Sequence, residues 1–130
     1  MTYSIGQVAE LTHLSAHTLR FYEKEGLVRP ERTDTGLRDY NEEDVQAVLF
    51  INCMKKTGMS IADIGKFMEL SYSSNPDETL SMRIAMLAEQ EARVAQQITH
   101  LEECRSYIEQ KIKWYQDPSS MEKPTAPIQD

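Results

Sequence analysis

Two short stretches with helical spacing of apolar residues open the chain. After Ser4, which can cap a helix, apolar residues recur at three-residue intervals at Ile5, Val8 and Leu11. A break follows, and Ser15 can cap a second helix that runs to Glu25. Gly26 then suits the left-handed position that commonly ends a helix. Two short helices joined by a tight turn predict a helix-turn-helix.

The segment after the second helix predicts a small two-stranded wing. Residues 27–29 and 37–40 flank the turn-rich stretch 33–36. Gly36 can adopt positive φ in that turn, and Pro30 is tolerated only at the edge or end of a strand. We therefore expect a hairpin whose first strand ends before Pro30.

Two more helices are predicted before residue 72. Asn41 and Ser60 can cap them, each with an aspartate three positions later, and Gly58 separates them. The first covers residues 42–56 and is apolar over much of its circumference, at Val45, Val48, Leu49, Phe50, Ile51 and Met54. It is expected to be the buried helix of the domain.

The C-terminal half carries a heptad pattern, after a break that Pro76 can end by opening a helix. Positions alternate at four- and three-residue intervals along a seam: Leu80, Ile84, Leu87, Glu91, Val94, Ile98, Leu101, Arg105, Ile108, Ile112 and Tyr115. Such a pattern predicts a coiled-coil helix of roughly 50 Å. A head of about 70 residues cannot bury this seam alone, so we expect the same helix of a second copy to cover it.

These patterns divide the chain into three regions and make it mainly α-helical. The expected parts are a winged helix-turn-helix head over residues 1–72, with four helices and the wing, a coiled-coil dimerisation helix over 76–116, and a flexible tail over 117–130. No apolar run approaches the roughly 20 residues of a membrane helix, and the N-terminus lacks the features of a secretory signal. We therefore expect a cytoplasmic protein with no membrane partner.

Composition narrows the possible chemistry. With 40% hydrophobic and 27% charged residues the chain is typical of globular proteins. The two cysteines, Cys53 and Cys104, lie far apart in sequence, which argues against a zinc site or a disulfide framework. The sequence also contains no Ser/His/Asp set, Gly-rich phosphate loop or metal cluster. We expect neither an enzyme nor a cofactor.

Cations are concentrated in one window although the net charge is −7. Within residues 19–40 they alternate with aromatic residues and turn formers, at Arg20, Lys24, Arg29, Arg32 and Arg38. Bulk charge does not favour nucleic acid, so any contact with it must come from cations gathered on one face.

The stretch LRFYEKEGLVRPERTDTGLRDYNEEDV, residues 19–45, resembles the N-terminal domain of MerR-type transcription regulators. The matching positions are Arg20, Phe21, Tyr22, Glu23, Gly26, Leu27, Pro30, Arg32, Gly36, Arg38 and Tyr40, and GMSIADI at 58–64 is similar to the family's turn into its fourth helix. Phe21 departs from the pattern, because the family more often has tyrosine there. The resemblance covers residues 3–70, and the rest matches in kind as one long dimerisation helix.

The resemblance implies a dimeric protein that binds and distorts promoter DNA and so controls the access of RNA polymerase to it. His17, Thr18 and Arg20 would approach major-groove base edges or nearby phosphates. Phosphate contacts are expected from Arg38 and Tyr40 on the wing, and from Tyr22 and Lys55. Three alternatives stay open: Arg20 paired with Glu23, Tyr40 as a strand aromatic packed on the third helix, and His17 as an ordinary surface residue.

The two polar seam positions suggest how the dimer is arranged. Glu91 and Arg105 lie on opposite sides of Ile98 at equal separation. An antiparallel pair of helices centred near Ile98 would bring each residue close to its opposite charge on the other chain, which would fix the register. If the supercoil slips, both residues face solvent instead.

Cys53 is the candidate for signal sensing. Its place in the third helix is similar to that of the single cysteine in the short aldehyde- and electrophile-responsive branch of the family, and Lys55 and Lys56 nearby favour a thiolate. The alternative is a small buried core residue. Cys104 is expected to pack at the flank of the coiled coil.

Two other functional classes fit a helical head on a coiled coil. A protein-binding adaptor would not need the Arg38–Tyr40 wing, whereas an excisionase-like factor that bends DNA would not need the long dimer helix. The sequence therefore favours a transcription regulator over both.

Overall fold

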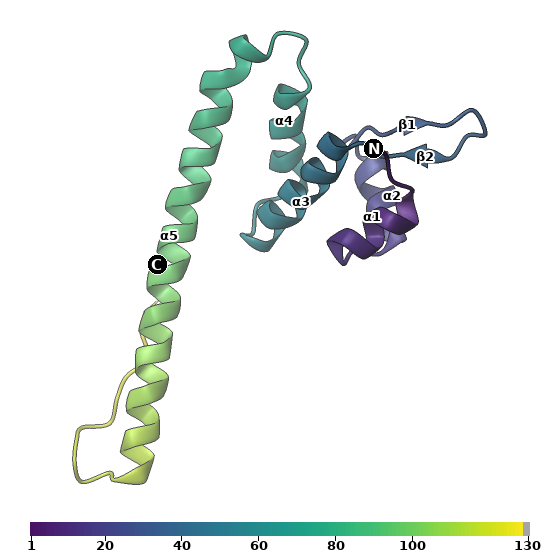
Figure 1. The fold of residues 1–130 in the computed structure, drawn as a ribbon. Coiled ribbons are helices and arrows are strands. Elements are labelled where there is room, and N and C mark those ends of the chain that lie inside the picture. The colour runs from purple at the N-terminus through teal and green to yellow at the C-terminus, as the bar shows by residue number, and fades with distance from the viewer. Residues whose placement is uncertain (129–130) are drawn as a thin grey trace. The chain divides into compact units, whose positions relative to one another are not determined.

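The computed structural model describes residues 1–128, which form five helices and one hairpin (Figure 1). The order is α1 (Ile5–Thr12), α2 (Ala16–Lys24), β1 (Glu31–Arg32), β2 (Arg38–Asp39), α3 (Glu42–Lys56), α4 (Ile61–Ser71) and α5 (Pro76–Gln116). The mainly α-helical class with a two-stranded antiparallel wing is confirmed.

Local capping explains where the helices begin. The side chains of Ser4, Ser15, Asn41 and Ser60 each accept a hydrogen bond from the backbone N–H three residues later. Asn41 and Asp44 form a reciprocal capping box, with the Asn41 N–H donating to Asp44 Oδ2 at 2.9 Å. These caps satisfy backbone donors that a helix leaves free at its start, and they account for the agreement with the predicted helix starts.

Gly26 ends α2 in the manner that the sequence predicts. Its φ is +74°, and the N–H groups of Gly26 and Leu27 donate to the carbonyls of Glu23 and Tyr22 at 3.0 and 2.9 Å. This pair of hydrogen bonds is the Schellman arrangement, in which a left-handed residue turns the chain away from the helix. The turn sends Leu27 and Val28 into the core, where neither is more than 1% exposed.

The position of the first wing strand corrects the sequence prediction. The strand lies at Glu31–Arg32, after Pro30, and not at residues 27–29. Leu27 and Val28 are used for core packing instead, and Pro30 separates them from the hairpin because it has no N–H to donate. The second strand, Arg38–Asp39, falls within the predicted segment.

Two residues of the apolar helix patterns are exposed in the structure. Leu11 is 55% exposed and Thr12 is buried in its place, because the Thr12 hydroxyl donates to the Val8 carbonyl at 2.7 Å and needs no water. Leu49 is 39% exposed, whereas Val45, Val48 and Ile51 form the buried face of α3. One stripe of α3 is therefore buried rather than most of its circumference.

The core of the head joins α1, α2, α3 and α4. Its buried residues are Val8, Leu19, Tyr22, Leu27, Val28, Tyr40, Val45, Val48, Ile51, Ile64, Phe67 and Met68. The chain divides into two compact units, Met1–Met86 and a second one that begins at Leu87, so the first turns of α5 belong with the head. Of the predicted flexible tail, residues 117–128 form neither helix nor strand, and residues 129–130 lie outside the described part.

Candidate nucleic-acid interface

One face of α2 presents basic side chains to the surface. His17, Arg20 and Lys24 are exposed and recur at helical spacing, whereas Leu19 and Tyr22 on the opposite face are buried. Since the core fixes Leu19 and Tyr22, the direction of the exposed stripe is fixed as well. A nine-residue helix with this division can lay its outer face into a groove of DNA.

The side chains on α2 differ in their exposure and in their contacts with neighbouring residues. Thr18 is partly covered, and its hydroxyl lies 3.0 Å from the Ser15 hydroxyl at the helix start. Arg20 has no ion pair among the described residues, which excludes its pairing with Glu23 in this structure. Lys24 is not among the contacts that the sequence predicts, although its spacing of four from Arg20 is a signal that could have identified it.

The wing is a very short hairpin attached to the head at both ends. Its register places Arg32 opposite Arg38, and the Thr33 N–H donates to the Leu37 carbonyl at 2.7 Å across the turn. Gly36 takes φ +84° in this turn, as predicted. Beyond the second strand, Tyr40 and Tyr3 exchange two backbone hydrogen bonds of 2.7 and 2.8 Å.

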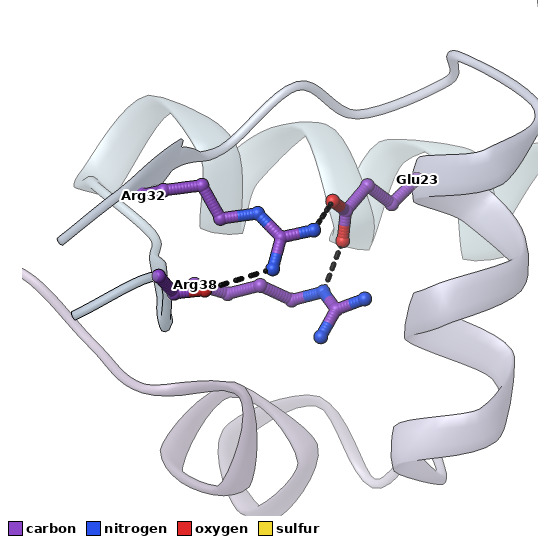
Figure 2. Close-up of polar contacts among 4 residues, drawn as sticks. Glu23, Arg32 and Arg38 are labelled. Carbon is purple, nitrogen blue, oxygen red and sulfur yellow. Dashed lines mark hydrogen bonds and ion pairs between the residues drawn. The ribbon is translucent and has the colours of Figure 1, made fainter. Parts of the chain in front are cut away.

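A carboxylate from α2 bridges the two wing arginines (Figure 2). Glu23 accepts from Arg32 Nη2 at 2.9 Å through Oε1 and from Arg38 Nε through Oε2. Arg32 Nη1 also donates to the Gly36 carbonyl at 3.1 Å. The sequence does not predict this contact between helix and wing, because residues 9 and 15 positions apart meet only through the fold.

Two predicted contact residues lie inside the core. Tyr22 is 1% exposed and Tyr40 is fully buried, and among the described residues none offers a hydrogen-bond partner to the Tyr40 hydroxyl. Burial raises the pKa of both hydroxyls, and for Tyr40 the nearby Glu23 carboxylate raises the pKa further. This position favours the packing alternative for Tyr40 and leaves Tyr22 without an exposed ring to contact a phosphate.

Helix α3 supplies two further candidate residues. Lys55 is exposed, and its Nζ lies 5.6 Å from the centre of the Tyr22 ring, so a cation–π contact holds this cation close to α2. Cys53 is exposed near the end of the same helix. The structure therefore does not support the buried-core alternative for Cys53.

The heptad seam of α5 is largely uncovered in the single chain. Leu80, Ile84, Leu87, Ile98, Leu101, Ile108, Ile112 and Tyr115 are between 38% and 65% exposed. Glu91 and Arg105 are exposed too, and Arg105 Nε lies 3.6 Å from Glu109 on its own helix. An apolar row of this length is typical of a surface that another protein segment covers.

One contact on α5 is not among those that the sequence predicts. Cys104 Sγ lies 3.6 Å from His100 Nε2, at a helical spacing of four that could have indicated it. Within residues 1–128 no group of three or more His, Cys, Asp or Glu side chains is placed to hold a metal ion. No helix in this range is long and apolar enough to cross a membrane.

Comparison with known proteins identifies the family. The model of the MerR HTH family regulatory protein matches residues 3–71, and that of the MerR DNA-binding region matches residues 45–111. The chain belongs to the MerR family. It is therefore a DNA-binding transcription regulator with a helix-turn-helix, and not an enzyme.

Individual MerR-family relatives cover most of the chain. An HTH-type transcriptional regulator of Haemophilus influenzae is 35% identical over 93% of this chain and 89% of its own. The regulator AdhR of Bacillus subtilis is 40% identical over 70% of this chain and 64% of its own.

Solved MerR-family structures show the same fold. HiNmlR, a MerR family regulator lacking the sensor domain and bound to promoter DNA, superposes with a TM-score of 0.84 at 32% identity, over 96% of this chain and all of its own. A MerR-family regulator from Bacillus thuringiensis gives a TM-score of 0.79 at 38% identity, over 87% of this chain and 98% of its own. The family membership favours transcription regulation over the adaptor and excisionase-like alternatives.

Proposed function

We propose that this regulator binds promoter DNA as a homodimer, with α2 in the major groove and the wing on the flanking backbone. The observation that carries this proposal is the exposed cationic stripe of α2, which Glu23 connects to the wing arginines. His17, Thr18 and Arg20 approach base edges or adjacent phosphates, while Arg38 and Lys55 contact phosphates. The promoter DNA bound to HiNmlR, a structure of the same fold, supports this assignment.

The burial of two tyrosines modifies the expected set of contacts. Tyr40 acts through packing at the base of the wing, and Tyr22 acts as the platform on which Lys55 rests. Lys24 joins the set as a phosphate contact, since it is exposed one helical turn beyond Arg20.

The second copy covers the seam of α5 as an antiparallel partner. Eight large apolar side chains on the seam of α5 are more than a third exposed in the single chain, and heptad spacing is the pattern that two helices bury together. With Ile98 at the centre, Glu91 of each chain meets Arg105 of the other. Arg105 then exchanges its exposed 3.6 Å contact with Glu109 for a more enclosed one.

Dimerisation gives the protein two DNA-binding heads for one promoter. Two recognition helices at a fixed separation engage two half-sites, and the DNA between them bends or untwists to satisfy both. This distortion changes the relative position of the promoter elements that RNA polymerase reads. Specificity then comes partly from the deformability of DNA that the protein does not touch.

Reactive aldehydes or related electrophiles are the proposed signal, received by Cys53. Cys53 is exposed on α3, and its sulfur can add to an aldehyde carbonyl, forming a C–S bond while the thiol proton passes to the carbonyl oxygen. Lys55, two residues further along α3, contacts the Tyr22 ring of α2, so a shift at the end of α3 can reach α2.

Footprinting on the protein's own upstream region tests the promoter claim. We expect protection of a spacer between the −35 and −10 elements, with affinity falling steeply as salt rises. Protection elsewhere, or none, contradicts the proposal.

A cysteine pair tests the sensing claim. Cys53→Ser is expected to abolish induction by formaldehyde or methylglyoxal without changing promoter affinity, whereas the control Cys104→Ser keeps induction. Undiminished induction in Cys53→Ser removes the sensing role and leaves promoter binding intact.

A further inference from the structure

Glu23 is the one carboxylate among the described residues that forms ion pairs with both wing arginines. Its two oxygens are divided between them, one accepting from Arg32 and the other from Arg38 (Figure 2). The side chains of Glu23 and Arg38 are only 19% and 22% exposed, whereas that of Arg32 is 48% exposed. The bridge therefore joins the last turn of α2 to both strands of the wing in a partly enclosed place.

We propose that Glu23 is a positioning residue that sets the orientation of the wing against α2 and thereby favours the specific promoter site over other DNA. The inference rests on the proposed function of these two elements in DNA binding. Glu23 itself carries the wrong charge to contact a phosphate, so it acts through the arginines that it holds.

The wing needs such a contact because its own pairing is weak. A ribbon with two residues in each strand is marginal by itself. Its register sets Arg32 directly opposite Arg38, and like charges in that position repel. One carboxylate between the two guanidinium groups replaces this repulsion with two charge-assisted hydrogen bonds.

The hydrogen bonds give the two arginines different roles. Arg32 uses one terminal nitrogen on Glu23 and the other on the Gly36 carbonyl, so it connects α2 to the tip of the hairpin. Arg38 binds Glu23 through Nε, which leaves both of its terminal nitrogens for a phosphate. Arg32 is therefore a structural link, and Arg38 is the wing cation that reaches the DNA backbone.

The charge of Glu23 has a separate effect on non-specific binding. It offsets part of the positive charge of the wing, and non-specific affinity depends on the cations available to replace counterions. Loss of the carboxylate is therefore expected to lower the affinity for the promoter, which depends on the orientation of the wing, and to raise the affinity for non-specific DNA. A residue that only stabilised the fold would lower both affinities together.

The test compares Glu23→Gln with Glu25→Gln in the full-length protein. Both variants remove one negative charge near the end of α2, but Glu25 is exposed and makes no ion pair among the described residues. Affinities are measured for the promoter fragment and for a scrambled duplex of equal length over a range of salt. Glu23→Gln is expected to lower affinity for the promoter about tenfold and to raise affinity for the scrambled duplex about twofold. Glu25→Gln is expected to change the ratio of the two affinities less than about twofold.

Two further measurements separate geometry from charge. Glu23→Asp keeps the charge but shortens the side chain, so it is expected to lose promoter affinity without gaining on the scrambled duplex. Amide hydrogen exchange of the free protein is expected to accelerate over residues 31–39 in Glu23→Gln while exchange in α3 is unchanged.

The outcomes distinguish the inference from the proposed function. A wild-type protein without preference for the promoter contradicts the proposed function. Amide hydrogen exchange of the wing then still decides whether Glu23 orients the wing. The positioning role is overturned if the wild type prefers the promoter but Glu23→Gln loses affinity equally for both duplexes, or leaves the ratio of the two affinities unchanged.

Discussion

Replacing Tyr40 with phenylalanine separates its packing role from a phosphate contact. The ring is fully buried, and the hydroxyl has no hydrogen-bond partner among the described residues. Phenylalanine keeps the ring and removes only the oxygen. If Tyr40 acts through packing, the substitution leaves DNA binding unchanged and relieves an unpaired polar group.

The structure sets the size of the expected effect. A buried hydroxyl without a partner costs about 1–3 kcal/mol, so Tyr40→Phe is expected to raise the free energy of unfolding by up to about 1 kcal/mol once the lost packing of the oxygen is deducted. For a domain of this size that raises Tm by about 4 °C. Tyr40→Ala also removes the ring and is expected to lower the free energy of unfolding by about 3–5 kcal/mol.

Urea unfolding at a fixed protein concentration measures the stability, and titration of a labelled promoter fragment measures the affinity. Fixing the concentration is necessary because the stability of a dimer depends on it. A hydrogen bond from a tyrosine to a phosphate is worth about tenfold in affinity. Normal stability with a tenfold loss of affinity in Tyr40→Phe would show that the hydroxyl contacts DNA and would refute the packing role.

Three other predictions follow from charges at named positions. Burial raises the pKa of Asp44, so protonation of this carboxyl group stabilises the folded state. The free energy of unfolding of the wild type relative to Asp44→Asn is therefore expected to be highest below pH 3.8 and to decline as pH rises through the raised pKa. A difference that grows with pH in urea unfolding contradicts this sign. Glu91→Arg is expected to weaken the dimer in sedimentation experiments and Glu91→Arg with Arg105→Glu to restore it, whereas no restoration rules out the antiparallel register. Affinity falls as salt rises, and Arg20→Ala and Arg38→Ala are each expected to make the plot of log affinity against log salt less steep, by about 0.9 for every phosphate that the variant complex no longer neutralises. An unchanged slope argues against phosphate binding at that position.

The helices are predictable because their ends are encoded locally. Ser4, Asn41 and Ser60 act within three residues of their own positions, so the cap and the helix start can be read together from the sequence. Gly26 ends α2 for a reason equally close in sequence. The predicted span 42–56 matches α3 at both ends.

The details of the interface are less predictable because they depend on the tertiary fold. The sequence indicates that Arg32 and Arg38 share a wing, but not that Glu23 lies between them. The aromatic pattern indicates that Tyr22 and Tyr40 belong to the site, but only the packed core shows that both are buried. The sequence places the first strand too early because Val28 suits a strand and Pro30 suits its end, but Leu27 and Val28 are used for core packing instead.

In the proposed mechanism, two heads of one dimer engage and distort a single promoter. Energy transfer between dyes at the two ends of a promoter fragment, recorded during titration with the protein, tests it most directly. We expect that transfer changes as protein is added and saturates at two chains per duplex, while a scrambled duplex shows no change at the same salt. Saturation at one chain per duplex, or binding to the promoter with no change in transfer, contradicts it.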